Sequence, residues 1–394
     1  MAYRICMLAV GKLPVPAVQG GACEALAQAL LDQNERDPKI EFTVLSVDHP
    51  EARKQAAGYK HAKFVWFKPQ VLWNKFWWRI RAAGIQLAHR ELPFPYQRVQ
   101  AAKWLRSHTD EFDFILTECD LDTIQYAGIA PEKVLNHLHW VGRPTPQNDA
   151  SFGQLIPVSE FVGRGWADAA GRSMDTVHVL PNAVPDHCFA VQPPETRSEM
   201  RQKLGIAADA FVVLYVGRIV AYKGVRELMQ VVDRLPDDNT VLVLAGSTNF
   251  GLGTCDEYER QAHALAQQSK KQMLFTGFVP NDQLGPYYAM ADVVAMPSLC
   301  QEAAGMVAIE AMAAGRPVAA SVSGGLPEYV TPECGILVPQ GDGLEEGLRE
   351  ALIKLRADPA LREAMGKAGQ ARAQQFRQRA YYQRFLDILQ NLHA

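Results

Sequence analysis

The sequence lacks several features that would place the protein in a specialised class. Its seven cysteines are odd in number, scattered and without a Cys-x-x-Cys pair, which predicts reduced thiols in the cytoplasm and argues against structural zinc. No apolar run approaches the ~20 residues that a membrane-spanning helix needs. Residues 1–10 are apolar but lack a small-residue cleavage site, so we expect a first strand there and not a signal peptide. A net charge of −3 gives no reason to expect nucleic acid as a partner.

The length and composition are those of a globular protein with more than one domain. A chain of 394 residues is too long for a single ordinary core, and two domains of about 200 residues are the natural expectation. A hydrophobic content of 48% with 21% charged residues is typical of a soluble protein.

Short apolar runs alternate with helical patterns along the whole chain. Strands are expected at 4–10, 41–47, 112–117, 133–137, 154–158 and 176–180, then at 211–216, 241–245, 273–276, 293–296 and 318–320. Helices are expected at 22–33 and 225–233. A proline-rich joint at 182–194 separates the two series. The alternation predicts two doubly wound α/β domains, 1–185 and 186–373, with ligands bound in the cleft beyond the carboxyl ends of the strands.

The segment 297–315 carries the strongest functional pattern. Glu302 lies in a loop, Gly305 opens an alanine-rich helix, and Glu310 follows inside that helix. The free N–H groups and the dipole of a helix start suit a phosphate, and ionised carboxylates suit sugar hydroxyls. The segment therefore indicates a nucleotide-sugar site, although a strand, a turn and a helix ending at Gly315 would look the same in any α/β protein.

Two cations follow the strand expected at 211–216. Arg218 can hold phosphate oxygens as a planar fork, and Lys223 can act as a mobile point charge. Together they would compensate the charge of a diphosphate leaving group. The alternative is a loop with two solvated cations.

Other candidates come from the first half of the chain. Gly20 and Gly21 lie between the first strand and the first helix, where the backbone can approach a ligand. His139 follows an apolar strand and can bond a substrate hydroxyl or move a proton. A metal site shared with His137 is conceivable but not expected, on the interpretation that the two side chains point to opposite faces of the strand. Asp120-Leu121-Asp122 is better explained by helix capping than by metal binding.

The segment 53–90 combines basic charge with tryptophan. It contains nine Lys or Arg residues, no Asp or Glu, and four of the seven tryptophans. This pattern suits a membrane surface, an anionic acceptor or a platform on which sugars stack. A partly buried amphipathic helix with solvated cations is the alternative.

These residues together resemble the family 4 retaining glycosyltransferases of the GT-B fold. The resemblance spans nearly the whole chain. Its marks, in chain order, are Gly20-Gly21, His139, Pro157-Val158-Ser159, Pro181-Asn182, Gly217-Arg218, Lys223-Gly224, Phe275-Thr276-Gly277-Phe278-Val279, Pro297-Ser298, Glu302 with seven residues before Glu310, and Gly324-Gly325-Leu326-Pro327-Glu328.

The resemblance implies roles for these positions. Two Rossmann-like domains would face a central cleft, and the second would hold most of the nucleotide-sugar. The helix at about 374–394 would pack back on the first domain, although its periodicity alone favours its own domain. The donor site implied by the resemblance consists of Arg218, Lys223, Gly305, Met306 and Val307 at the diphosphate, Glu302 and His139 at the sugar, Glu310 at the ribose, Phe278 and Val279 at the base, and Gly20 and Gly21 at the diphosphate and acceptor.

The mechanism implied is front-face transfer with retention. The diphosphate would leave through an oxocarbenium-like state and take the acceptor proton, so that no protein nucleophile, cofactor or metal ion is required. Ala303 and Ala304 depart from the proline or small residue and phenylalanine that the family often has after Glu302, which puts the donor sugar in doubt. Ala183 replaces a glycine that is common in the joint, so hinge freedom there is expected to be lower.

The sequence predicts an enzyme that transfers a hexosyl or N-acetylhexosaminyl group from a nucleoside diphosphate sugar, with uridine diphosphate expected. The acceptor is a glycan, a lipid-linked intermediate or a small molecule, as in bacterial polysaccharide biosynthesis. The expected location is the cytoplasm or the inner face of the cell membrane. Two alternatives stay open, a nucleotide-sugar epimerase of the same fold and a non-catalytic coat or scaffold protein.

Overall fold

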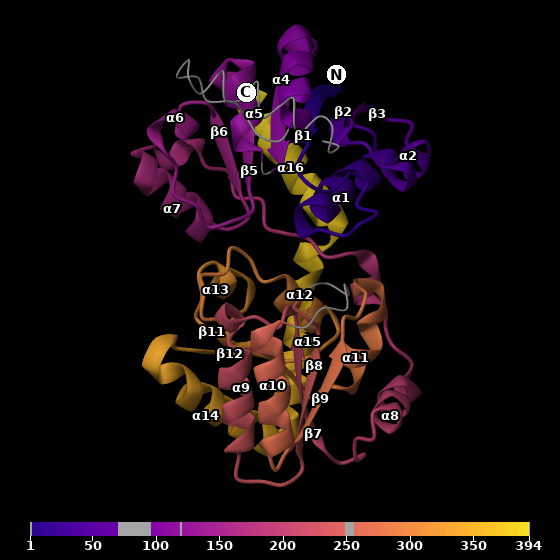
Figure 1. Ribbon diagram of the computed structural model, residues 1–394, viewed down its shortest axis with the longest axis vertical. Helices are drawn as coiled ribbons and strands as arrows, with labels where there is room; N and C mark the ends of the chain where they lie inside the picture. The colour runs from indigo at the N-terminus through magenta and orange to yellow at the C-terminus, as the bar shows by residue number, and fades with distance from the viewer. Residues whose placement is uncertain (1, 70–95, 119, 249–255, 394) are drawn as a thin grey trace. The chain divides into compact units, whose positions relative to one another are not determined.

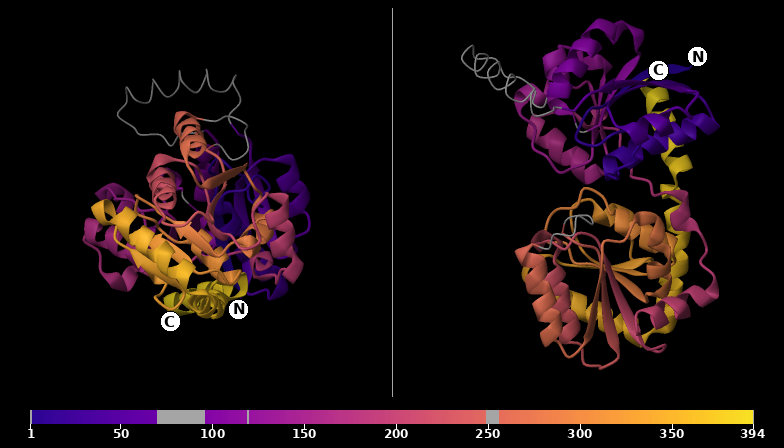
Figure 2. Two further views of the ribbon diagram at one scale, coloured as in Figure 1. Left: turned by 90° about the horizontal axis from the view of Figure 1, so that it is seen from below. Right: turned by 45° about the vertical axis from the view of Figure 1, so that its right-hand side comes forward.

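The computed structural model describes residues 2–69, 96–118, 120–248 and 256–393. The chain divides into two compact α/β units (Figure 1). Unit 1 comprises Met1–Asn182 with Tyr381–Ala394, and unit 2 comprises Ala183–Ala380. Each unit has a six-stranded parallel sheet with helices on both faces (Figures 1 and 2). The predicted α/β class with two doubly wound sheets is confirmed.

The sheet of unit 1 has the strand order β3-β2-β1-β4-β5-β6, the order of the doubly wound dinucleotide-binding fold. Its strands are β1 (Tyr3–Ala9), β2 (Ile40–Val47), β3 (Ala62–Phe67), β4 (Phe114–Glu118), β5 (Val134–Leu138) and β6 (Gln154–Pro157). Its helices are α1 (Ala22–Arg36), α2 (Pro50–Ala56), α4 (Tyr96–His108), α5 (Leu121–Ala127), α6 (Pro146–Asp149) and α7 (Glu160–Ala170).

Local signals explain where these helices begin and end. Ser159 caps α7 by accepting a hydrogen bond from the Val162 N–H, and Gly171 ends it in the left-handed conformation. Asp120 caps α5 in the same way, accepting from the backbone and the hydroxyl of Thr123. The interpretation of Asp120 as a helix-capping acid is therefore confirmed.

One predicted strand of unit 1 is wrong and another was missed. Residues 176–180 run beside β6, with hydrogen bonds from His178 N to Leu155 O and from Leu180 N to Pro157 O, but they form only an isolated bridge at Val177. β3 lies in the basic segment, where a helix had been the alternative considered. Its apolar run at 64–67 was the available signal, but the segment had been interpreted from its basic charge and tryptophans instead.

The sheet of unit 2 has the order β12-β11-β10-β7-β8-β9. Its strands are β7 (Phe211–Val216), β8 (Thr240–Ala245), β9 (Gln272–Gly277), β10 (Val293–Met296), β11 (Val318–Ser321) and β12 (Gly335–Val338). Its helices are α8 (Pro194–Lys203), α9 (Val225–Asp233), α10 (Glu257–Gln268), α11 (Gly285–Met290), α12 (Met306–Ala313), α13 (Leu326–Tyr329), α14 (Leu344–Ala357) and α15 (Pro359–Ala373).

Both faces of this second sheet are buried, which explains its continuous apolar strands. Along β7, Val212 and Leu214 face the core that includes α8, α11 and α12, while Val213 and Tyr215 face the core that includes α9 and α14. Because neither face meets water, the strands show no alternation of apolar and polar residues.

The last helix, α16 (Gln378–His393), lies in unit 1 from Tyr381 onward. Tyr381, Phe385 and Leu389 are buried there. The Tyr382 hydroxyl donates a hydrogen bond of 2.6 Å to Asn34 Oδ1, which links α16 to α1 of unit 1. Gln374–Phe376, just before it, belongs to unit 2.

Candidate active site

In unit 2 the loop after β7 packs on the loop after β10. Gly224 has φ +70°, and a Cβ added to it would lie 2.0 Å from the carbonyl oxygen of Pro297. The Leu299 N–H donates to the carbonyl of Tyr222 over 2.9 Å. Only a glycine allows this approach, which brings Lys223 beside the loop that carries Glu302.

Lys223 and Glu302 form an ion pair. The Lys223 Nζ lies 2.6 Å from Glu302 Oε1, and the Ser298 hydroxyl also donates to that oxygen. The side chains are 26% and 13% exposed, so the pair is sheltered but reachable from solvent. The structure thus joins two of the predicted site residues.

Arg218 lies on the same loop as Lys223. Its guanidinium is 5.5 Å from the ring centroid of Tyr222 and donates to the hydroxyl of that residue. The Tyr215 hydroxyl donates to the Arg218 carbonyl over 2.6 Å and fixes the backbone. Tyr222 is 42% exposed, so it holds the guanidinium at the surface of the unit.

The backbone around Glu302 is held by Gly325, which is one of the marks of the resemblance, and by Ser323 and Gln340, which the sequence did not single out. Ser323 Oγ accepts from the Glu302 N–H over 3.0 Å, and the Gly325 N–H donates to the Glu302 carbonyl over 2.8 Å. Gln340 donates from Nε2 to the carbonyls of Ser298 and Cys300. A serine before two glycines was the available signal, whereas nothing near Gln340 in the sequence indicated its role.

The helix α12 begins close to these loops in the chain. Gly305 is its N-cap and provides no side-chain cap, so the N–H groups of Met306 and Val307 stand at the positive end of the helix. A Cβ on Gly305 would lie 2.4 Å from Leu326 Cδ1. Packing against α13 therefore requires a glycine here, in addition to any approach by a ligand.

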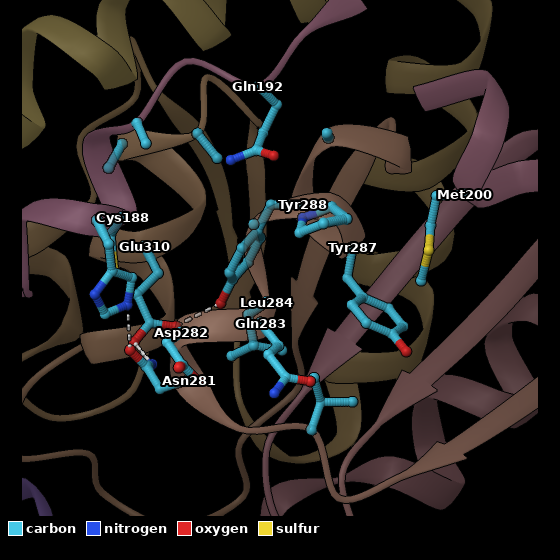
Figure 3. A pocket seen from close by; sticks show the side chains of 18 of the residues that line it. Cys188, Gln192, Met200, Asn281, Asp282, Gln283, Leu284, Tyr287, Tyr288 and Glu310 are labelled. Carbon is cyan, nitrogen blue, oxygen red and sulfur yellow. Dashed lines mark hydrogen bonds between the residues drawn. The ribbon is translucent and has the colours of Figure 1, made fainter. Parts of the chain in front are cut away.

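Glu310 differs from Glu302 in its surroundings. It is 5% exposed, and its carboxylate accepts from Asn281 Nδ2 over 2.8 Å and from the Tyr288 hydroxyl over 2.6 Å (Figure 3). Burial raises the pKa of Glu310, against the lowering effect of these two bonds.

A pocket of about 830 Å³ in unit 2 has Glu310 in its lining (Figure 3). Phe278 and Val279 also line this pocket. It therefore brings together the residues expected at the ribose and the base. Arg218, Lys223, Glu302 and Gly305 are not among its lining residues.

In unit 1, Gly20 and Gly21 precede α1, both with positive φ. No atom lies within 4 Å of a Cβ added to Gly20, so a ligand can reach the backbone there. A Cβ on Gly21 would lie 2.0 Å from Glu24 Oε2 and 2.9 Å from Leu13 Cδ1. Glu24 is thus folded back over the glycine, and burial raises its pKa.

His139 follows β5, and its side chain is only 6% exposed. Its Nε2 lies 2.8 Å from Glu118 Oε2. His137 Nδ1 lies 3.0 Å from Glu118 Oε1, and the two imidazole centroids are 3.9 Å apart. The prediction that the two rings point to opposite faces is wrong, because residues i and i+2 of a strand line the same face, and both rings contact Glu118.

Glu118 is a buried residue of this site that the sequence did not reveal. Burial alone would raise its pKa, but the charge of His137 and hydrogen bonds from both rings lower it to about 2. The ligand atoms of Glu118, His137 and His139 lie within 4.8 Å of one another, so these three could also hold a metal ion. The available signal was position, since Glu118 ends β4 and is paired in register with His137.

The basic segment is described only in part. Residues 70–90 of it, with three of its four tryptophans, lie outside the described residues. In the described part, Arg53 pairs with Asp48 and lies 5.2 Å from the Trp66 ring centroid. Among the helices in the described ranges, none combines the length and the hydrophobicity required to cross a bilayer.

Comparison with known proteins gives a family match that lies within unit 2. The family model "Glycosyl transferases group 1" matches residues 196–372, which lie in unit 2. A GDP-mannose-dependent monoacylated alpha-(1-6)-phosphatidylinositol monomannoside mannosyltransferase of Corynebacterium glutamicum is 34% identical over 55% of this chain. That match spans about half of the relative, 56% of its length.

Two further likenesses extend over almost the whole chain. Spore coat protein SA of Bacillus subtilis is 26% identical over 94% of both chains. The crystal structure of Anabaena Alr3699/HepE in complex with UDP-glucose is 21% identical, with a TM-score of 0.73 over 99% of this chain and 100% of that one. The chain has the GT-B fold, and its residues 196–372 match the model of Glycosyl transferases group 1.

Proposed function

We propose that the protein is a retaining glycosyltransferase that takes a sugar from a nucleoside diphosphate sugar. The observation that carries the proposal is the Lys223–Glu302 pair in unit 2, on loops that also carry Arg218 and lead to the start of α12. Few other functions need mobile cations, a phosphate-binding helix start and a carboxylate in one place.

The chemistry assigned to unit 2 is stabilisation of the leaving group. Arg218, Lys223 and the N–H groups of Met306 and Val307 would bind the diphosphate and disperse the charge that grows as the glycosidic bond breaks. Glu302 would accept hydrogen bonds from sugar hydroxyls. Glu310, with Phe278 and Val279 in the same pocket, would bind the ribose and the base.

The chemistry assigned to unit 1 is the approach of the acceptor. Gly20 leaves backbone open to a ligand just before α1, Gly21 would join it at the diphosphate and acceptor, and His139 would contact a sugar hydroxyl. The acceptor hydroxyl would attack from the face that the diphosphate leaves and give its proton to a departing phosphate oxygen. The anomeric configuration is then retained, and the reaction proceeds without a bound metal ion.

The nucleotide and the acceptor are part of the proposal. UDP is the expected nucleotide, as in the UDP-glucose complex of the structural neighbour, and GDP is the alternative named by the mannosyltransferase relative. We propose a glycan, lipid-linked or small-molecule acceptor and action in the cytoplasm, at the inner face of the membrane where an acceptor is lipid-linked.

The first test is calorimetric titration of the full chain with UDP, GDP, ADP and CDP. One nucleotide should bind selectively, and Arg218→Ala should lose at least tenfold in affinity, since charge-assisted bonds to phosphate are removed. Arg349→Ala is the matched control, because Arg349 pairs with Glu346 on the exposed surface of α14. Absence of binding to all four would favour the coat or scaffold alternative.

A second test addresses the reaction itself. Transfer from the donor that binds should release free nucleotide only when an acceptor is present, which separates a transferase from an epimerase. Proton NMR of the first-formed product gives the anomeric configuration, and an inverted product would contradict the retaining mechanism. A chelator should leave the rate unchanged.

A further inference from the structure

Unit 1 contains a buried carboxylate between two histidines. Glu118 ends β4, His137 lies beside it on β5, and His139 follows that strand. Their side chains are 3%, 0% and 6% exposed. The hydrogen-bond distances to Glu118 are 3.0 and 3.1 Å from His137 Nδ1 and 2.8 Å from His139 Nε2.

The carboxylate determines where the ring hydrogens lie. An ionised carboxylate only accepts hydrogen bonds, and the three short contacts from the two rings favour the ionised form of Glu118. Both nitrogens that face it must therefore carry hydrogen. A neutral His137 then has its hydrogen on Nδ1, and a neutral His139 has its hydrogen on Nε2. The two rings are held in opposite tautomers by one group.

The second nitrogen of each ring is then a lone-pair acceptor. His137 Nε2 lies 3.5 Å from the hydroxyl of Tyr381 on α16, which can donate to it. His139 Nδ1 makes no hydrogen bond with any residue in the described ranges. That nitrogen can receive a hydrogen from a hydroxyl, whereas its lone pair would repel a phosphate oxygen.

We propose that Glu118 is a positioning residue that fixes His139 with its hydrogen on Nε2, so that Nδ1 accepts a hydrogen bond from a sugar hydroxyl of the substrate. The inference rests on the proposed function for the identity of the substrate, but the tautomers it requires belong to the protein alone. It makes His139 an acceptor for a hydroxyl and not a donor to the diphosphate.

Distances favour this arrangement over a metal site. Bonds of 2.0–2.1 Å from zinc to nitrogen or oxygen in a tetrahedron would place neighbouring ligand atoms about 3.3 Å apart. The shortest observed separation, 2.8 Å, is a hydrogen-bond distance. A metal ion would also require that both facing nitrogens lose their hydrogens.

The test is NMR of the full chain with ¹⁵N-labelled histidine at neutral pH, which reports directly which ring nitrogens carry hydrogen. Signals are assigned with His137→Gln and His139→Gln. The expected result is hydrogen on Nδ1 of His137 and on Nε2 of His139, with loss of this opposite pattern in Glu118→Gln. Two rings with the same tautomer, a His139 ring with hydrogen on both nitrogens, or a spectrum changed by added zinc would overturn the proposal.

Matched variants separate positioning from folding and from the proposed function. Asp120→Asn removes a buried carboxylate two residues away that bonds Thr123 and not a histidine, so the histidine pattern should persist. Glu118→Gln should bind the nucleotide normally in unit 2 but transfer sugar roughly tenfold more slowly, the effect of one hydrogen bond. An unchanged transfer rate in a folded Glu118→Gln overturns the positioning role. Failure of the wild-type chain to bind nucleotide contradicts the proposed function while the spectrum still decides the tautomers.

Discussion

Glu118 in unit 1 and Glu302 in unit 2 both lie at or beyond the carboxyl end of a parallel strand, yet their partners differ in kind. Glu302 pairs with a lysine that is 26% exposed, on a loop that solvent reaches. Glu118 lies between two imidazoles that are almost fully buried. The comparison indicates that unit 2 offers movable charge, whereas unit 1 offers a fixed pattern of hydrogen-bond donors and acceptors.

Glu302 and Glu310 of unit 2 show the same contrast between a movable charged partner and fixed neutral partners. Glu302 has a cationic partner, while Glu310 accepts from two neutral donors in a buried site. Burial raises the pKa of Glu310, so its environment stabilises the charged form less well. An acid that exchanges partners with a substrate and an acid that keeps a fixed geometry require these different surroundings.

The largest expected effect comes from breaking the movable pair. Lys223→Ala and Glu302→Gln should each lower kcat by about 10²–10³, the cost of removing one preorganised charge from a developing transition state. The double variant should lose less than the product of the two, because each residue acts partly through the other. Steady-state kinetics with the donor identified by calorimetry measures these effects.

A matched control sharpens this prediction. Lys367 and Glu363 form an ion pair on α15 with the same 2.6 Å separation, but with side chains 73% and 69% exposed. Lys367→Ala should leave kcat unchanged and alter the free energy of unfolding by less than about 1 kcal/mol. Equal losses in the two lysine variants would contradict a specific role for Lys223.

The second effect concerns stability in unit 1. The pKa of Glu118 falls from an ordinary value of 4.5 to about 2 on folding, so its contribution is present above pH 4.5 and is lost as the pH falls through about 2. At about 1.4 kcal/mol for each pH unit, this amounts to roughly 3 kcal/mol. Glu118→Gln should therefore lower the free energy of unfolding at pH 7 and remove this part of the acid dependence, as measured by urea unfolding at several pH values.

Glu310 should show the opposite sign. Because its pKa is raised on folding, the folded protein binds that proton more tightly, and the free energy of unfolding falls as pH rises through the folded-state pKa. Subtracting the urea curves of Glu310→Gln from those of the wild type isolates this slope. The effect should be smaller than that of Glu118, since bonds from Tyr288 and Asn281 offset part of the burial. If the difference in the free energy of unfolding between the wild type and Glu310→Gln rises with pH, the pKa of Glu310 is not raised on folding.

The smallest expected effect lies in the basic segment. If it contacts an anionic surface, binding to vesicles with phosphatidylserine should weaken as salt rises, because exposed charges are screened. Lys60 and Lys63 are exposed, and replacing both with alanine should weaken binding by about 1 kcal/mol for each. Arg53→Ala should matter less, since Arg53 already pairs with Asp48. Binding that is absent or independent of salt would refute membrane contact.

The sequence by itself predicted every strand of unit 2 except β12 (Gly335–Val338), and it proposed that Lys223 and Glu302 lie at one site. Apolar runs as long as β7 and β8 are predicted correctly because both faces of the strand are buried and the pattern is local. Lys223 and Glu302 could be linked because each follows such a strand, and parallel strands end at the same edge. The apolar run at 64–67 in β3 is local as well, but the basic charge and tryptophans around it had been interpreted as a binding surface or an amphipathic helix.

Only the tertiary structure decided how residues on neighbouring strands meet. The contact of Glu118 with His137 depends on the order and register of β4 and β5, and His139, two residues further on, reaches the same carboxylate from the same face. The same holds for Tyr288 and Asn281 around Glu310, which come from segments 20 or more residues away. Hydrophobic periodicity specifies which face of an element is buried, whereas strand order and register follow from the free energy of the whole fold and leave no local pattern.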